Sequence, residues 1–413
     1  MFMKSKWIKI VLAAVLTFAI LAGCAGDAAP GTPAAADEPA AAGEPAQTEE
    51  PTGQQAAANG LDADEVRIGI IAPLTGGAAV FGIASSNGTR LAFNEINAAG
   101  GILGAPINYF LSDDMHSPVD SIQAFDRQVH NDNVVAVVGP VTSGPATAVA
   151  QANVDTRIPI VTPTATAYGV TTPGDFIFRA CFLDAQQAIA MANFAMDSLG
   201  AQTAAVLYDV AMDYSTGLAE NFRAHFESRG GTIVAWESYT GGDVDFRPQL
   251  TSIRDAAPDV LFFPDYFSVV ALMAAQVAEL GLDATLLGGD GWEGVFTVLD
   301  DPNLLNGAFY SAHFSADDPS PVVQDFIRNY TEQFGEPPNS FAALGYDAGR
   351  IIVQAIEEAG STDNEAIIRA LAALNFSGVT GNISFDAGGN PIKSVIVTSI
   401  QDGTARLYTY VAP

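Results

Sequence analysis

The sequence predicts an α/β fold of two Rossmann-like lobes, each with a mostly parallel sheet and surrounding helices. Beyond residue 64, short β-branched runs alternate with segments of helical periodicity, which is the pattern of βα units. The alternation comes in two successive blocks, which begin near residues 66 and 204 and are each near the size of one domain. Helices and then strands follow the second block, so we expect the chain to return and complete both sheets.

The first block contains five expected strands. The unbroken apolar run at 134–138 is typical of a strand in the centre of a parallel sheet. A helix through 84–99 ends at Gly100-Gly101, because glycine readily takes the left-handed backbone that closes a helix. In order, the expected strands are residues 66–71, 107–111, 134–138, 158–161 and 176–178.

The second block and the tail continue the pattern. Leu218, Phe222 and Phe226 are spaced by four and give one helix an apolar face, and a later helix at 269–280 ends at Gly281. The expected strands are 204–208, 232–236, 260–263 and 285–287. In the tail we expect helices at 321–334, 341–359 and 365–374, and strands at 383–385, 394–400 and 406–411.

Residues 1–24 have the three parts of an export signal. Lysines precede an apolar run at 10–20, and small residues follow it. The run is too short for a membrane span, which needs about 20 apolar residues. The ending Leu21-Ala22-Gly23-Cys24 resembles a bacterial lipobox, which implies cleavage before Cys24 and lipidation of Cys24. The alternative is an ordinary secretory signal in which the cysteine is incidental.

Residues 25–64 contain no Lys, no Arg and no aromatic residue, and consist mainly of Ala, Pro, Gly, Thr, Gln and acids. Such a segment cannot bury enough apolar surface to offset the entropy of ordering it. We therefore expect a disordered acidic linker that holds the folded body away from a membrane.

The charge and the functional residue types exclude several classes. The net charge is −30, from 47 acidic and 17 basic residues, so nucleic acid is an improbable partner. Only Cys181 remains after the lipobox cysteine, so no intramolecular disulfide is available. The chain lacks the G-x-S-x-G, H-E-x-x-H, G-K-[ST] phosphate-loop and C-x-x-C motifs. Its four histidines (His116, His130, His225 and His313) lack metal-ligand spacing, so we expect no catalysis, no metal and no cofactor.

Six segments, taken in order, resemble the solute-binding proteins of branched-chain amino acid ABC transporters, the Leu/Ile/Val-binding type. These segments are residues 68–76, 94–102, 138–143, 159–166, 343–348 and 380–386. The resemblance implies a type 1 periplasmic binding protein fold, in which three chain crossings hinge two lobes. It suggests crossings near 179–183, 311–314 and 380–384.

Together these features predict the domain organisation of the whole chain. Residues 1–24 are the signal and 25–64 the linker; 65–182 with 312–382 form the N-terminal lobe, and 183–311 with 383–413 the C-terminal lobe.

An amino acid is a zwitterion, so its receptor needs donors for the carboxylate and an acceptor or anion for the ammonium. Ser143 stands where a helix is expected to begin, as its cap, and free N–H groups at a helix start suit a carboxylate. Alone this is an ordinary helix cap, but the resemblance assigns Ser143 to the ligand carboxylate. It also implies that the Ala165 carbonyl binds the ammonium and that Thr166 binds the carboxylate.

The second lobe is expected to supply the anionic partner. Asp290, in a Gly-Gly-Asp-Gly turn after a strand, corresponds to the family's acidic residue for the ammonium, where Glu is more usual. The resemblance makes Tyr214 and Tyr266 aromatic contacts with the ligand. Phe81, where many relatives carry Tyr, and Trp292, next to the acid, are expected to complete the side-chain walls.

The sequence therefore predicts a lipid-anchored, extracytoplasmic, monomeric receptor that passes a small amino acid to an ABC permease. One alternative keeps the fold but makes the protein a sensor coupled to a membrane receptor, for amides, urea or aromatic acids. Another is a surface-anchored serine hydrolase that uses Ser143 or Ser215 as its nucleophile.

Overall fold

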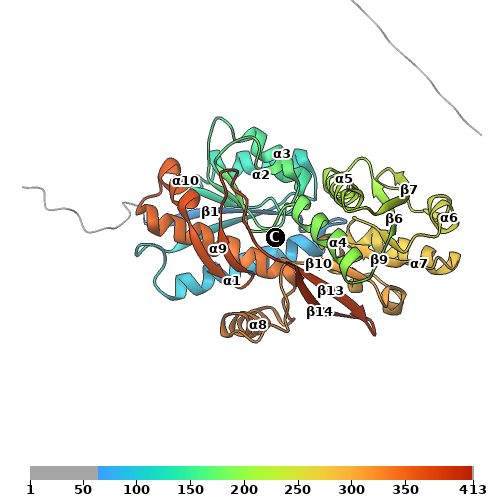
Figure 1. The fold of residues 1–413 in the computed structure, drawn as a ribbon. Coiled ribbons are helices and arrows are strands. Elements are labelled where there is room, and N and C mark those ends of the chain that lie inside the picture. Colours follow the sequence, from blue (N-terminus) through green and yellow to red (C-terminus); the bar gives the residue numbers. More distant parts are fainter. Residues whose placement is uncertain (1–63, 412–413) are drawn as a thin grey trace, which may run out of the picture. The chain divides into compact units, whose positions relative to one another are not determined.

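A computed structural model describes residues 64–411 of the chain. The predicted signal, its Cys24 and all but the last residue of the predicted linker lie outside the described residues. Within the described part, two large sheets are wrapped by helices, and a small two-stranded sheet accompanies them (Figure 1). The predicted fold class of two α/β lobes is confirmed.

The first lobe contains a five-stranded, fully parallel sheet with the order β2-β1-β3-β4-β5. Its strands are β1 Val66–Ala72, β2 Ile107–Asp113, β3 Ala136–Val138, β4 Ile160–Thr162 and β5 Ile177–Arg179. All five lie where the sequence pattern predicts them, with ends that differ by no more than two residues.

Side chains alternate across this sheet, so each strand contributes to two cores. On β1, Ile70 belongs to the core under helices α1 and α9, whereas its neighbour Ile71 belongs to the core under α2 and α3. The helices of this lobe are α1 Ala79–Ala98, α2 Pro118–His130, α3 Ser143–Ala152, α8 Pro321–Phe334, α9 Ser340–Ala359 and α10 Asn364–Ala373, with the short turn η1 Tyr168–Val170.

The second lobe contains a seven-stranded sheet with the order β14-β13-β10-β9-β8-β6-β7. The strands are β6 Thr203–Asp209, β7 Thr232–Tyr239, β8 Val260–Phe262, β9 Thr285–Gly288, β10 Phe309–Ala312, β13 Val395–Gln401 and β14 Thr404–Val411. Its helices are α4 Asp184–Asp197, α5 Asp213–Ser228, α6 Arg247–Ala256 and α7 Phe267–Leu280, with the short turns η2 Asp290–Trp292, η3 Val295–Thr297 and η4 Pro302–Leu305. Strand β13 pairs antiparallel with both of its neighbours, β10 and β14, and the other pairs of this sheet are parallel.

The expectation that the returning chain completes both sheets is wrong for the first sheet. Both long late strands, β13 and β14, join the second sheet, whereas β11 (Asn375–Gly378) and β12 (Gly381–Ser384) pair only with each other. Each strand of this hairpin buries one side chain, Phe376 or Ile383, and leaves the others at or near the surface. Strand β10 was also missed, since its segment was assigned only to a crossing.

Three segments connect the two lobes, at residues 180–183, 313–320 and 385–394. The third begins after β12, slightly later than predicted. Lys393, the only lysine beyond the leader, is buried there and donates from Nζ to Thr380 Oγ1 at 2.8 Å and to the Ala180 carbonyl at 3.4 Å. Thr380 in turn donates to Asp347 of α9 at 2.7 Å. This network ties the first crossing to the third.

Helices α1 and α9 approach backbone to backbone and place two aromatic side chains of the site. Thr89 of α1 donates to the Gly345 carbonyl of α9 at 2.8 Å, and a Cβ atom at Gly345 would clash with the Ser85 carbonyl oxygen. This close contact fixes Phe81, near the start of α1, beside Phe341, near the start of α9; their ring centroids are 4.5 Å apart.

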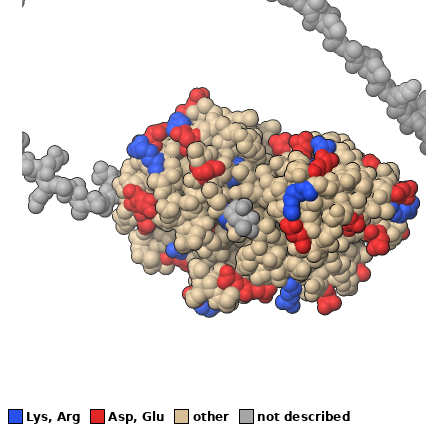
Figure 2. Space-filling view, viewed as in Figure 1, with Lys and Arg blue, Asp and Glu red and all other residues tan. Residues whose placement is uncertain are grey.

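Acidic groups cover more of the visible surface than basic groups, on both lobes (Figure 2). None of the helices in the described residues is long and apolar enough to cross a membrane.

The α1–α9 contact makes a stability prediction. Gly345→Ala should lower the free energy of unfolding by about 1–3 kcal/mol, because the added methyl group forces two helix backbones apart. Gly144→Ala in α3 is the matched control, since its Cβ would meet open space and alanine favours helix. Urea unfolding measures both. Equal stability of the two variants would contradict the backbone-to-backbone packing.

Candidate ligand-binding site

Each sheet has a switch point where successive βα units wind in opposite directions, and ligands of such sheets bind beyond the carboxyl ends of the strands there. In the first sheet the point lies between β1 and β3, which lead to Phe81 and Ser143. In the second sheet it lies between β6 and β8, which lead to Tyr214 and Tyr266. The topology thus directs the predicted residues of both lobes to the ends of strands at these two points.

Asp290 is a buried carboxylate held by three donors. At Oδ1 it accepts from the Tyr214 hydroxyl and from Gln187 Nε2, both at 3.0 Å. At Oδ2 it accepts from His313 Nε2 at 2.9 Å. The Tyr214 hydroxyl accepts from the Gly291 N–H at 2.8 Å, so its own proton is directed to Asp290. The donors therefore fix the carboxylate in one orientation.

These donors leave the negative charge of Asp290 unneutralised. Burial lowers the pKa of His313 below its usual value, even though Asp290 acts in the opposite direction, so the imidazole is neutral at pH 7. Within residues 64–411, no Lys or Arg forms an ion pair with Asp290. A buried carboxylate favours a cation beside it, because an unpaired buried charge is costly.

A second carboxyl, Asp184 at the start of α4, shares a donor with Asp290. Gln187 Nε2 also donates to Asp184 Oδ1 at 3.1 Å, whereas Asp184 Oδ2 has no hydrogen-bond partner among the described residues. Burial, and next the negative charge of Asp290, raise the pKa of Asp184 to about 8. Burial therefore keeps a proton on the Asp184 carboxyl at pH 7.

The start of α3 supplies the groups suited to a carboxylate. The helix begins at Ser143 with Thr142 as its cap, so the expectation that Ser143 is the cap is wrong by one residue. Thr142 makes no capping bond to the first turn; its hydroxyl lies 2.9 Å from His116 Nδ1 instead. Ser143 Oγ accepts from the Ala167 N–H at 3.2 Å. The hydroxyl of Thr166 is buried and lies beside the Asp184 carboxyl, and their interaction opposes the rise in the pKa of Asp184.

Arg179 supports the loop that carries Ala165 and Thr166. Its buried guanidinium donates from Nη1 to the carbonyls of Ala165 at 2.9 Å and Ala167 at 3.0 Å. One acceptor position of the Ala165 carbonyl is therefore occupied by the protein, and one lone pair is left for a ligand.

Aromatic rings from both lobes meet in the site. Phe81 of the first lobe packs edge to face against Tyr266 and Phe267 of the second, with centroids 5.1 Å apart in both pairs. The cavity among these rings measures ≈10 Å³, which holds about one water molecule. It is lined by Phe81, Val141, Thr142, Thr164, Tyr214, Tyr266, Asp290, Gly291 and Phe341.

The structure brings four of the eight predicted ligand residues to this small cavity: Phe81, Tyr214, Tyr266 and Asp290. Ser143 lines an adjoining cavity of ≈550 Å³, which Tyr266 also borders. Ala165 and Thr166 are fully buried and line neither of these two cavities.

Trp292 does not line either of these cavities. Its indole N–H donates to the Phe263 carbonyl at 2.9 Å, and its ring belongs to the large hydrophobic cluster that also contains Phe263. The reason is local: Asp290–Trp292 is a turn of 3₁₀ helix, so neighbouring side chains point in different directions.

Three residues of the site were not singled out from the sequence. Asp184 and Gln187 are three residues apart on α4, so they lie on the same face of that helix. His313 lies in a predicted crossing. A histidine within a predicted crossing was the sequence feature that could have indicated His313, and the spacing of metal ligands does not reveal such a residue. Groups of three or more metal-ligating side chains do not occur among residues 64–411.

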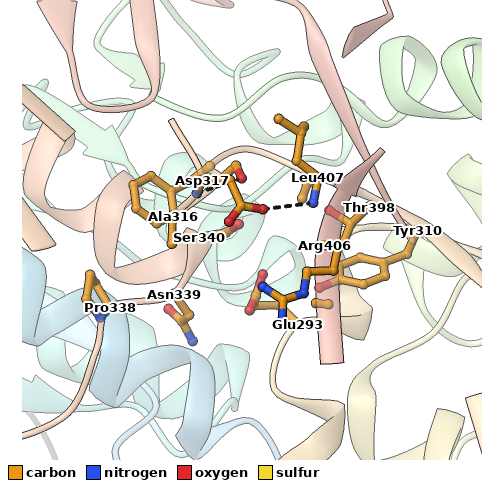
Figure 3. Close-up of a pocket in the computed structure, with 14 residues that line it drawn as sticks. Glu293, Tyr310, Ala316, Asp317, Pro338, Asn339, Ser340, Thr398, Arg406 and Leu407 are labelled. Atoms are coloured by element: carbon orange, nitrogen blue, oxygen red, sulfur yellow. Dashed lines mark hydrogen bonds between the residues drawn. The ribbon is translucent and has the colours of Figure 1, made fainter. Parts of the chain in front are cut away.

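A further cavity of ≈240 Å³ lies beside the segment that follows Asp290 (Figure 3). Glu293 and Tyr310 of the second lobe and Ser340, the first residue of α9, line it. Burial raises the pKa of Glu293 to about 7, and its interaction with Ser340 opposes this effect. This contact joins the Asp290 segment to the opposite lobe.

Known proteins share this architecture. Residues 65–405 match the family described as periplasmic binding protein. A Leu/Ile/Val-binding protein homolog of Brucella melitensis is 33% identical over 74% of this chain and 82% of its own length. A leucine-, isoleucine-, valine-, threonine- and alanine-binding protein of Pseudomonas aeruginosa is 29% identical over 81% of this chain and 89% of its own length.

Solved structures agree with this relationship. A leucine binding protein from Thermotoga maritima superposes with a TM-score of 0.79 at 32% identity, and covers 84% of this chain and 99% of its own. A branched-chain amino acid transporter substrate-binding protein from Streptococcus pneumoniae, solved with isoleucine, gives 0.80 at 30% identity over 84% of this chain and 100% of its own.

The buried carboxyl of Asp184 makes a prediction about stability and pH. Its pKa is about 8 in the folded protein against 3.8 ordinarily, so the folded state holds a proton that the unfolded chain releases. The contribution of Asp184 to the free energy of unfolding is fully present below pH 4 and is lost as the pH rises toward 8. Asp184→Asn should therefore reduce the fall in melting temperature of the ligand-free protein between pH 5 and 8.

Asp283→Asn, at an exposed acid, should leave that fall as in the wild type. A wild-type slope in the Asp184→Asn variant would show that Asp184 is ionised in the folded protein.

Proposed function

Because the match over residues 65–405 shows that the chain belongs to the periplasmic binding protein family, we propose that it binds a small amino acid between its lobes and delivers it to an ABC permease. The family consists of extracytoplasmic binding proteins, not enzymes. Similarity to proteins named for leucine, isoleucine and valine supports an aliphatic amino acid as the ligand.

The observation that carries the proposal is the charge of Asp290. Three neutral donors orient this buried carboxylate, and the cation that would neutralise it is not supplied by the described residues. The ammonium group of an amino acid is a cation of suitable size with three donors. Urea, amides and aromatic acids are weaker candidates, since none of them carries a positive charge.

The carboxylate end of the ligand is proposed to bind the first lobe. The start of α3 offers the positive end of a helix dipole, the Ser143 hydroxyl lies there, and the Thr166 hydroxyl lies on the neighbouring loop beside Asp184. The two charged ends of one ligand would then contact different lobes. A ligand without both charges would lose the contacts to one of them.

Closure of the lobes converts binding into a signal. Ligand contacts made by both lobes exist only in the closed state, so the ligand shifts the population toward it. We propose that the two lobes move against each other about the crossings at residues 180–183, 313–320 and 385–394, and that the permease recognises the closed form. Since Phe81 contacts Tyr266 across the site, these rings must separate to admit the ligand.

The anchor belongs to the same proposal. Lipidation at Cys24 would hold a monomeric receptor at the outer face of the cell membrane, with residues 25–64 as its tether. The hydrolase alternative has little support, because neither Ser143 nor Ser215 is hydrogen bonded to a histidine within residues 64–411.

Asp290→Asn tests the proposal. The amide keeps the shape of the side chain but removes its charge, so amino acid affinity should fall more than tenfold in calorimetry. The ligand-free variant should melt at an equal or higher temperature, because a buried unpaired charge is removed. Asp300→Asn, at an exposed acid downstream, is the matched control and should bind as the wild type does.

Unchanged affinity of Asp290→Asn would remove Asp290 from the ammonium site. A loss of affinity together with a lower melting temperature would point instead to a structural role.

A further inference from the structure

His313 lies where the three crossings and the binding site meet. It is the first residue of the second crossing, and its ring stacks on Phe182 of the first crossing with centroids 3.6 Å apart and planes 24° apart. It lines a cavity of ≈360 Å³ together with Lys393 of the third crossing. Its Nε2 atom contacts Asp290 Oδ2. Of the three side chains that donate to the Asp290 carboxylate, only that of His313 belongs to a crossing between the lobes.

We propose that His313 is a positioning residue that makes ligand affinity depend on its protonation. As a neutral imidazole it orients Asp290 toward the ligand ammonium; as an imidazolium it takes the place of the ammonium as the counter-ion of Asp290. The inference rests on the proposed function and adds a proton-linked control to the same site.

The neutral form has a defined tautomer. An ionised carboxylate only accepts hydrogen bonds, so Nε2 carries the proton that is donated to Asp290. Nδ1 is then an acceptor, and it has no partner among the described residues. With Tyr214 and Gln187 holding Oδ1, the His313 bond completes the orientation of the short Asp290 side chain. A free Asp290 carboxylate would rotate and lose part of the ammonium contact.

The charged groups around His313 oppose one another. Burial is the largest influence and lowers the pKa of His313; Asp290 raises it, and Lys393 lowers it. Asp184 lies on the far side of Gln187, and Tyr214 and Phe182 bring no charge at neutral pH. Of these groups, Asp290 alone stabilises the protonated ring.

A ligand ammonium beside Asp290 removes that stabilisation. Its positive charge cancels the attraction of Asp290 for a proton on His313, so ligand and proton compete for the same carboxylate. The pKa of His313 in the free protein is already below 6.5. Affinity should therefore be constant near neutral pH and fall as the pH drops through the pKa of free His313, by at most about tenfold per pH unit.

The Lys393 ammonium acts against this protonation. Lys393 lines the same cavity as His313, and none of the other residues that line this cavity is an acid. Like charges repel one another, so Lys393 lowers the pKa of His313 and moves the loss of ligand affinity to lower pH.

Calorimetry from pH 8 to pH 5 tests the proposal, with L-alanine, L-threonine, L-valine, L-leucine and L-isoleucine as probes. The best-binding probe should lose affinity progressively as the pH falls below 6.5 in the wild type. His313→Gln keeps a donor for Asp290 but cannot be protonated, so it should lose this acid dependence whatever its affinity at pH 8. His225→Gln is the matched control and should keep the wild-type profile. The His225 side chain is hydrogen bonded to Asn193 on α4.

A His313→Gln profile that falls in acid like that of the wild type would overturn the proposal. If no probe binds the wild type at pH 8, the proposed function itself fails, and a ligand-free measurement still decides the coupling. His313→Gln identifies the His313 imidazole signal in NMR spectra, and Asp290→Asn should move its titration midpoint to lower pH. An unmoved midpoint would overturn the His313–Asp290 coupling.

Discussion

One unneutralised negative charge, on Asp290, dictates the construction of the site. Three elements that are far apart in the sequence bring donors to it: Tyr214 from α5, Gln187 from α4 and His313 from the second crossing. All three are neutral at pH 7, so they orient the charge without cancelling it. The described residues thus leave a buried anion without a cationic partner, and the proposed ligand ammonium would supply one and offset the cost to stability.

The same constraint explains the arrangement around the anion. A second ionised acid beside Asp290 would be too costly, and burial keeps Asp184 protonated at neutral pH. The buried Arg179 guanidinium binds loop carbonyls and forms no ion pair with Asp290. Lys393 is tied to Thr380 and, through it, to Asp347. Each buried cation therefore supports the chain around the site, and the charge of Asp290 remains available.

Much of the fold could be predicted from the sequence, because parallel strands are apolar runs and helices end at glycine. The late strands were harder: β10 is short, and whether β11 and β12 join a sheet depends on tertiary contacts that no local pattern encodes. In the candidate site, Asp290, Tyr214 and Tyr266 were predicted from their places after strands and from family resemblance, and the structure brings them to one cavity. His313 and Gln187 were missed because their partners lie 23 and 103 residues away. Trp292 was adjacent in sequence, but the 3₁₀ turn directs it into the core.

The central claim is that the ligand is held by the attraction between its ammonium group and Asp290. Its most direct test compares, by calorimetry on the wild-type protein, the best-binding amino acid with the carboxylic acid that lacks only its amino group. The account predicts that the amino acid binds and that the deaminated acid shows no measurable binding at the same concentrations. Comparable affinity for the two compounds would contradict it.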